Sequence, residues 1–377
     1  MIYRFNPPFA RWVHSAFRIC GYTGLALGIC AAFVFGWHSR LSLGVILLMV
    51  LAGSAASFIV EIATQALVGG ERWVFYHHAL AVTGAVVLLL RSLGQPVLPY
   101  LDIAAVSLAV LLACGRAGCF LVGCCHGRPS DWGIRYGAKH VGAGFPSDLA
   151  GVYLLPVQAV EGMWVFVVAT VGGVMIWHRT APGSSLSWCL IAYGSARFIF
   201  EYWRGDRDRP SPWGLSEAQW TSLLLVTFAT ACQLAHLLPF TPWQLAAVLA
   251  WAVVVAAISL RQRYRPVLRR LFRPNHVREV AFALDHLAAW RRLRPADAAC
   301  VRLEQTSEGI RISASRVTTP EGALLLYTLS NAEGEMDAVT ARALACLVGR
   351  LRHPDFRIGV VAQKPGIFHM ILGPDGP

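Results

Sequence analysis

Charged residues are scarce in this sequence. Asp, Glu, Lys and Arg make up only 14% of its 377 residues, whereas a soluble globular domain usually carries about 25%. Nearly all of the deficit lies before residue 262, and the chain becomes polar and charged beyond it. This change in composition predicts a domain boundary, and it makes a large soluble helical protein a poor description of the first part.

Other signals are missing as well. The N-terminal stretch has no short apolar region that ends in a small-residue cleavage site, so we expect the first apolar run to remain in the mature protein. No nucleic-acid-binding motif occurs, and the net charge of +12 therefore points to anionic lipid. The ten cysteines follow neither a disulfide framework nor the paired C-x2-C pattern of zinc sites. No metal and no cofactor is predicted.

The first part of the chain consists instead of long apolar runs. A helix needs about 20 residues to cross a bilayer, and eight runs approach or exceed that length. The expected spans are Phe17–Trp37, Leu43–Val68, Val74–Leu90, Leu98–Val122, Val157–Trp177, Ser185–Trp203, Gln219–Leu238 and Trp243–Leu260. Several contain Gly or Ser, which let helices pack closely in a membrane. These runs predict an all-α polytopic membrane bundle of seven to eight spans.

Three regions are expected along the chain. Residues 1–260 would form the membrane domain, 261–274 a basic linker and 275–377 a small soluble α+β domain. The basic run Arg261–Arg273 favours the cytoplasmic face and anionic lipid. In the last region we expect helices at Val277–Leu293 and Met336–Leu351, and strands at Cys300–Gln305, Ile310–Ser315, Ala323–Leu329, Ile358–Gln363 and Ile367–Leu372. No catalytic motif occurs there, so a regulatory or docking role is preferred.

One predicted span carries four polar side chains on one face. Tyr193, Arg197, Glu201 and Arg204 follow one another at helical spacing. A charge within a span costs about 2.5–3.5 kcal/mol or more, so it faces protein or water and usually marks a functional site. Arg197 and Glu201 are one turn apart and can form an ion pair. A purely structural ion pair that orders the bundle is the alternative.

A second polar stretch runs from Gly115 to Pro129. Its glycines allow the backbone to approach a ligand closely, and Arg116 lies in or near the end of a span. The planar guanidinium fork suits phosphate because it donates two parallel hydrogen bonds. Arg116 and Arg197, from two different helices, therefore predict a phosphate clamp.

The same stretch holds a group of cysteines, Cys119, Cys124 and Cys125, followed by His126. Small buried thiols are the preferred interpretation. A metal site stays open as an alternative, as does a reactive thiol whose pKa is lowered by Arg116 or His126.

His77 and His78 lie early in the third predicted span. Imidazole titrates near neutral pH and is the usual general base in enzymes. Adjacent helical side chains point to different faces, so at most one of the two histidines faces a site.

Taken in order, these motifs resemble the prolipoprotein diacylglyceryl transferase family. The stretches that carry the resemblance are Gly115–Gly127, Trp132–Gly133, Pro156–Glu161, Tyr193–Arg204 and Gln219–Trp220. The Tyr-Gly-x-x-Arg-x-x-x-Glu-x-x-Arg helix of that family matches at every defined position. Members of the family transfer a diacylglyceryl group from phosphatidylglycerol to the lipobox cysteine of a preprolipoprotein, and glycerol phosphate leaves.

The resemblance implies roles for individual residues. The implied catalytic positions are His77, Arg116, Arg197 and Glu201. The implied substrate-binding positions are Tyr193, Arg204, Cys119, Cys124, Gly127, Gln158, Glu161, His78 and Asp102. In this assignment the arginines hold the phosphate, Glu201 orients Arg197, and one of the two histidines is the base.

The match departs from the family at several positions. Cys119 and Cys124 stand where the family has Asn and Glu, and Leu155, Val157 and Val160 replace His, Ser and Tyr. A thiol is a weaker hydrogen-bonding group than either amide or carboxylate. These departures favour a diverged transferase with another acceptor or lipid. A catalytically inactive lipid-binding membrane protein with a regulatory soluble domain is the alternative, and a thiol redox or metal protein is a third interpretation.

The resemblance also implies the cellular setting, a multi-pass protein of the bacterial inner membrane. Its expected partners are phosphatidylglycerol or a similar anionic lipid and the signal peptides of lipoprotein precursors. With an even number of spans, the chain beyond Arg261 lies on the same side as the segment after the fourth span. The family places that segment outside, whereas the basic run favours the cytoplasm. Either one apolar run does not cross or the orientation is inverted.

Overall fold

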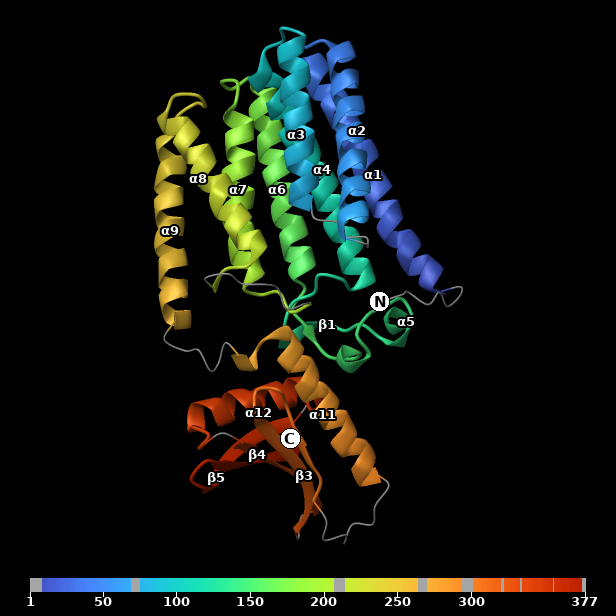
Figure 1. Cartoon of the computed structure of the whole chain (residues 1–377), viewed down its shortest axis with the longest axis vertical. Helices are drawn as coiled ribbons and strands as arrows, with labels where there is room; N and C mark the ends of the chain where they lie inside the picture. Colours follow the sequence, from blue (N-terminus) through green and yellow to red (C-terminus); the bar gives the residue numbers. More distant parts are fainter. Residues whose placement is uncertain are drawn as a thin grey trace.

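The computed structural model describes residues 9–68, 75–206, 214–263, 270–292, 301–319, 322–332, 334–354 and 356–374. Long helices form one end of the molecule and a smaller sheet domain forms the other (Figure 1). An irregular segment, residues 123–156, lies where the two parts meet.

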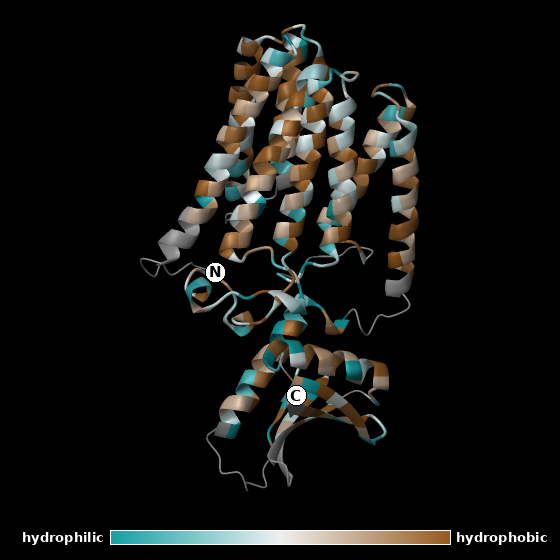
Figure 2. Ribbon diagram, turned by 180° about the vertical axis from the view of Figure 1, so that it is seen from behind, coloured by the Kyte–Doolittle hydropathy of each residue, from teal (hydrophilic) through white to brown (hydrophobic). Residues whose placement is uncertain are grey.

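Each of the eight expected spans is a helix. The helices are α1 (Phe9–His38), α2 (Leu43–Val68), α3 (Phe75–Ser92), α4 (Val97–Val122), α6 (Val157–Trp177), α7 (Ser184–Glu201), α8 (Glu217–Leu234) and α9 (Pro242–Arg263). Within the described parts of the chain, five of these helices are long and apolar enough to cross a membrane, namely α1, α2, α4, α6 and α9. Large hydrophobic side chains of the bundle, such as Leu51, Phe58 and Leu88, are exposed. The helices of the bundle are coloured largely as hydrophobic in Figure 2. The membrane bundle is thus confirmed, and crossing by α3, α7 and α8 stays a prediction.

Small residues bring the central helix α4 close to α1. A Cβ added at Gly24 would lie 2.7 Å from the Cys114 Cβ, and one added at Gly28 would lie 2.9 Å from the Ser107 carbonyl oxygen. Backbones that approach this closely gain van der Waals contacts, which drive helix association where lipid removes the hydrophobic driving force. Helix α4 is therefore held firmly, and its last turns are a rigid base for side chains.

The segment 123–156 leaves the bundle directly after α4. Gly123 ends the helix in the left-handed region, with φ at +84°, where glycine carries no Cβ penalty. Tyr136, Leu149 and Leu154 give the segment a buried hydrophobic face. Its elements are β1 (Pro129–Ile134), α5 (Ala138–Val141) and the 3-10 turn η1 (Ser147–Leu149).

The C-terminal part contains every helix and strand that the sequence predicts there. They are α11 (Pro274–Arg292), β2 (Leu303–Gln305), β3 (Ile310–Thr319), β4 (Gly322–Asn331), α12 (Ala338–Arg352), β5 (Phe356–Lys364) and β6 (Ile367–Pro374). The strands form one antiparallel sheet in the order β2-β3-β4-β6-β5, and the two helices pack against it (Figure 1). The exact domain limits stay a prediction, and part of the basic linker, residues 264–269, lies outside the described residues.

The sheet domain is joined to the segment 123–156 through a shared hydrophobic core. Tyr136 and Leu154 of the segment belong to the same buried cluster as Val280, Ile312 and Leu344 of the sheet domain. Such a continuous core excludes water from both parts at once, so each stabilises the other.

Ion pairs surround this core at its surface. Arg350 binds Asp131 at 2.8 Å, and Arg278 binds Asp148 at 2.9 Å. Arg352 donates to the backbone carbonyls of Asp148 and Ala281 at 3.0 and 3.3 Å and to the Asp285 carboxylate at 2.7 Å. Exposed pairs contribute little individually, whereas the Arg352 guanidinium satisfies backbone carbonyls from both parts.

The segment and the sheet domain lie at the same end of the bundle (Figure 1). Helices α6, α7, α8 and α9 separate them along the chain. The side of a membrane on which each of them lies stays a prediction.

We expect Arg352→Ala to loosen the contact between the sheet domain and η1, because the Asp148 carbonyl loses its donor and the Ala281 carbonyl, which lies inside α11, loses its second donor. The cost of a buried acceptor left unsatisfied is about 1–3 kcal/mol. Hydrogen–deuterium exchange should become faster in η1 and at the centre of α11. Arg342→Ala, an exposed position on the same helix α12, is the control. Equal exchange in the two variants would contradict the role given to Arg352.

Candidate active site

Three helices converge on one buried carboxylate. The Glu161 Oε1 of α6 lies 3.0 Å from the Arg116 Nη2 of α4 and 3.6 Å from the Arg197 Nε of α7. The Tyr193 hydroxyl donates to the same oxygen at 3.5 Å. Arg197 also binds Glu201 at 2.7 Å, one turn along α7. The two arginines that the sequence assigns to a phosphate clamp thus meet on the same side of the bundle.

This cluster is buried. The side chain of Glu161 is 0% exposed, that of Arg197 5% and that of Arg116 11%. Removing two ions from water costs several kcal/mol each, and mutual attraction recovers this only when the geometry is good and the remaining groups are hydrogen-bonded. Packing is tight here as well, because a Cβ added at Gly162 would lie 3.2 Å from the Arg116 Cβ.

Buried polar atoms of the cluster stay without a hydrogen-bond partner within the described part of the chain. Among them are the Arg116 Nε and the Glu161 Oε2. A guanidinium N–H that is desolvated and unpaired favours an acceptor ligand. The arrangement can therefore bind a group that brings oxygen acceptors to Arg116.

The backbone after α4 is held against the ends of two other helices. The Gly127 N–H donates to the Leu155 carbonyl at 3.0 Å, and the Gly205 N–H donates to the His126 carbonyl at 3.0 Å. Gln158 supports the same turn, since its Nε2 donates to the Cys124 carbonyl at 2.9 Å. A Cβ at Gly127 would lie 2.6 Å from Leu155, so glycine is required for this close approach.

A third buried arginine, Arg204, lies beside the turn that follows α4. Arg204 is 7% exposed, and its Nε and Nη2 bind the Asp206 carboxylate at 2.8 and 2.9 Å. The backbone of Arg204 forms a bridge with Gly127, which places this guanidinium beside the turn after α4.

Three thiols come together in that turn. The sulfur atoms of Cys119, Cys124 and Cys125 all lie within 4.8 Å of one another. Hydrogen bonds from the Cys119 and Cys124 thiols, together with the positive charges of Arg204 and Arg116, lower the pKa of Cys125. Cys119 is buried as expected, whereas Cys124 is exposed, so the interpretation as small buried thiols is wrong for Cys124.

Residues 69–235 match the family model described as prolipoprotein diacylglyceryl transferase. A curated phosphatidylglycerol–prolipoprotein diacylglyceryl transferase from Clostridium tetani is 32% identical over 161 residues, which cover 42% of this chain and 61% of the relative. Similar proteins from Clostridium perfringens and Methylibium petroleiphilum are each 30% identical, over 40% and 42% of this chain and 58% and 59% of their own lengths.

The segment 69–235 is thus similar to the prolipoprotein diacylglyceryl transferase family. This confirms the resemblance inferred from the motifs. The chain spans about three fifths of the length of the curated relatives it matches, and the sheet domain lies outside the matched region.

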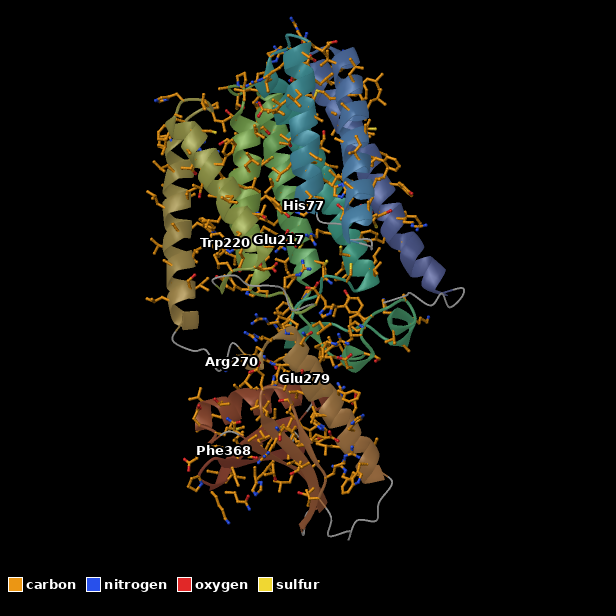
Figure 3. The ribbon with its side chains drawn as sticks, in the orientation of Figure 1. His77, Glu217, Trp220, Arg270, Glu279 and Phe368 are labelled. Atoms are coloured by element: carbon orange, nitrogen blue, oxygen red, sulfur yellow. The ribbon has the colours of Figure 1, made fainter. Side chains whose placement is uncertain are left out.

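Two histidines of the segment that matches the family lie outside the ion-pair cluster. The His77 Nε2 of α3 lies 3.5 Å from Glu217 at the start of α8, and both side chains are more than half exposed (Figure 3). His78 is buried, and its Nδ1 forms a 2.8 Å hydrogen bond with the Ser57 hydroxyl of α2. His78 therefore faces α2, and His77 is the histidine left facing the α8 side of the domain.

Asp102 is not brought to the cluster. Its carboxylate accepts hydrogen bonds from the backbone N–H groups of Gly183 and Leu186, both at 2.7 Å. It thereby caps the start of α7, where the helix dipole favours a negative charge. Asp102 and Arg116 are fourteen residues apart on α4, about 21 Å at 1.5 Å per residue, which separates this substrate-binding candidate from the others.

Sequence reasoning named Glu161 as one substrate-binding position among several and missed that it joins both arginines. It also missed Tyr136, whose hydroxyl donates to the Phe120 carbonyl at 2.8 Å and receives a 3.4 Å hydrogen bond from Gln158. Glu161 and Gln158 lie at helical spacing in one span, and a carboxylate inside a span is itself a signal for a buried cation partner.

We expect Glu161→Gln to lower the free energy of unfolding in mixed micelles by about 3–5 kcal/mol, because two buried guanidinium groups lose their shared counter-ion. Tyr193→Phe, which removes only one long hydrogen bond, should cost about 1 kcal/mol or less. Combining Glu161→Gln with Arg116→Gln should recover part of the loss by removing the excess charge. If the Glu161 and Tyr193 variants lose equal stability, Glu161 does not hold the cluster together.

Proposed function

We propose that this chain is a membrane-embedded transferase that moves a diacylglyceryl group from phosphatidylglycerol to a cysteine thiol of a lipoprotein precursor. The observation that carries the proposal is the meeting of Arg116 and Arg197 on Glu161 inside a domain of the transferase family. The curated relatives are named as phosphatidylglycerol–prolipoprotein diacylglyceryl transferases. The multi-pass fold suits the bacterial inner membrane, where such a lipid is available.

The phosphate of the lipid binds through directed hydrogen bonds. Glu161 and Glu201 already match the charges of Arg116 and Arg197, so the gain does not come from excess positive charge. It comes from guanidinium N–H groups that are already desolvated and oriented, above all the buried Arg116 Nε. A preorganised donor costs no reorganisation at the moment of reaction.

The same groups favour bond cleavage. As the bond between the glyceryl carbon and the phosphate oxygen breaks, negative charge accumulates on the departing glycerol phosphate. Arg116 and Arg197 stabilise that charge in a site shielded from water. The acceptor must be a thiolate, and half-exposed His77 with Glu217 is the candidate base that removes its proton.

The remaining assignments belong to the same proposal. Arg204 and Tyr193 line the mouth of the site, and Gln158 and Gly127 hold its floor. Residues 1–260 carry the transfer chemistry, and residues 275–377 act as a regulatory or docking module that reaches the site through the segment 123–156.

The test is a transfer assay with the purified chain, phosphatidylglycerol vesicles and a peptide that contains a lipobox cysteine. We expect the peptide to gain one diacylglyceryl group by mass. Arg116→Lys and Arg197→Lys keep the charge and lose the planar fork, so turnover should fall about 10²–10³-fold. Arg91→Ala, at an exposed position in the last turn of α3, should leave turnover unchanged.

Full turnover in both lysine variants would contradict the clamp. Binding of phosphatidylglycerol without any transfer to the peptide would instead favour the catalytically inactive lipid-binding protein. Absence of both binding and transfer would overturn the two functions together.

A further inference from the structure

The cluster of three thiols has no role in the transfer chemistry as described. Cys119 lies in the last turn of α4, and Cys124 and Cys125 lie in the turn that follows. Their sulfur atoms are all within 4.8 Å of one another. Three thiolates bound to one zinc ion at about 2.3 Å in tetrahedral geometry would be about 3.8 Å apart. The three sulfur atoms would therefore have to move only slightly closer together to coordinate one zinc ion.

The backbone has an unusual shape that makes this arrangement possible. Cys125 lies in the left-handed region with φ at +58°, which costs a non-glycine residue about 1–3 kcal/mol. This reversal brings the side chains of adjacent cysteines toward the same point, whereas in a regular helix or strand they diverge. The Gln158 hydrogen bond to the Cys124 carbonyl and the left-handed Gly123 hold the turn in that shape.

The electrostatic surroundings suit an anionic metal complex. Three thiolates and one divalent zinc ion carry a net charge of −1. Arg204 forms a backbone bridge with Gly127, two residues after Cys125, and the guanidinium groups of Arg204 and Arg116 are largely buried. Buried cations close to a metal site offset part of the negative charge of the thiolates that bind metal.

We propose that Cys119, Cys124 and Cys125 bind one zinc ion through three thiolates and leave its fourth position open. Catalytic zinc sites characteristically combine three protein ligands with an open position, whereas structural sites are closed by four. Cys124 is exposed, so the cluster can be reached from outside the bundle. Cys119 and Cys124 also stand where the family motif has Asn and Glu. The motif itself therefore lacks two of the three proposed ligands.

The open position suits the thiol of the acceptor cysteine, an assignment that rests on the proposed transferase function. On binding to zinc the acceptor gives up its proton to the proposed base His77 and stays a thiolate at neutral pH. Its sulfur lone pair forms the bond to the glyceryl carbon, and the carbon–oxygen bond to the phosphate breaks. Glycerol phosphate leaves with that electron pair, so no oxidant or reductant is needed. The uncharged thioether product is a weaker ligand and departs.

Metal binding is measured directly and without activity. The full chain, purified in detergent with a reductant and stripped by a chelator, is titrated with Co²⁺. We expect one ion per chain, with the thiolate charge-transfer and tetrahedral absorption bands, and displacement by Zn²⁺. Cys124→Ser, at an exposed position, should lower the affinity at least about 100-fold, more than the loss of a group that only supports a ligand. Cys119→Ser and Cys125→Ser should do the same.

Cys114→Ser is the matched control, because Cys114 lies on the same helix and contacts Gly24 of α1 instead of the cluster. It should keep full Co²⁺ affinity. Thermal unfolding of each variant shows whether a loss of metal reflects a loss of fold. Equal Co²⁺ binding by folded Cys124→Ser and Cys114→Ser variants, or no tetrahedral bands in the unaltered chain, would overturn the site.

The role of the ion is tested separately in the peptide assay. We expect lipidation by the stripped chain to fall at least about tenfold and to return when Zn²⁺ is restored. Metal binding together with no lipidation under any condition would leave the site standing and remove the proposed function. Lipidation that is unchanged by metal removal and by Cys124→Ser would keep the transferase and overturn the zinc-bound acceptor.

Discussion

The whole arrangement depends on a single carboxylate oxygen that is shared by two buried arginines. Glu161 lies on α6, Arg116 on α4 and Arg197 on α7, so the ion pairs fix the relative rotation of three helices. Apolar surfaces alone would leave that rotation weakly specified, because lipid is as apolar as the helix surfaces that pack together. The cost of burying the charges is offset only when all partners are in register.

That constraint extends beyond the helices. With the ends of α4, α6 and α7 fixed, the turn after α4 is pinned by backbone hydrogen bonds to Leu155 and Trp203. The segment that continues from this turn shares a hydrophobic core with the sheet domain. A displacement of the sheet domain would therefore be transmitted through packed side chains and backbone hydrogen bonds to the floor of the site. This gives a physical basis for a regulatory or docking role of the sheet domain.

Two of the arginines also act electrostatically on Cys125. In an apolar site a thiol stays protonated, because burial disfavours the charged form. At Cys125, hydrogen bonds from the Cys119 and Cys124 thiols, and then the charges of Arg204 and Arg116, instead lower the pKa. The departure from the family pattern is thus more than the loss of an amide and a carboxylate. It places soft, ionisable sulfur beside Arg116 and Arg204.

The sequence was sufficient to predict those elements whose structure follows from local periodicity or from the length of an apolar run. The eight helices could be predicted because a membrane requires long apolar runs whose backbone hydrogen bonds are satisfied within each helix. The pairing of Arg197 with Glu201 follows from helical spacing. The strands of the sheet domain followed from alternation and turn residues, since each strand buries one face.

Contacts between distant segments were decided by the tertiary structure. The convergence on Glu161, the capping of α7 by Asp102 and the pairing of His77 with Glu217 all join different helices. The three thiols come together only because Cys125 adopts a left-handed backbone conformation, and no sequence pattern predicts that conformation. Periodicity determines which side chains share a face of one helix. Which faces contact one another depends on the packing of all the helices together. The ion pairs of the buried charges and the close contacts at the glycines fix that packing.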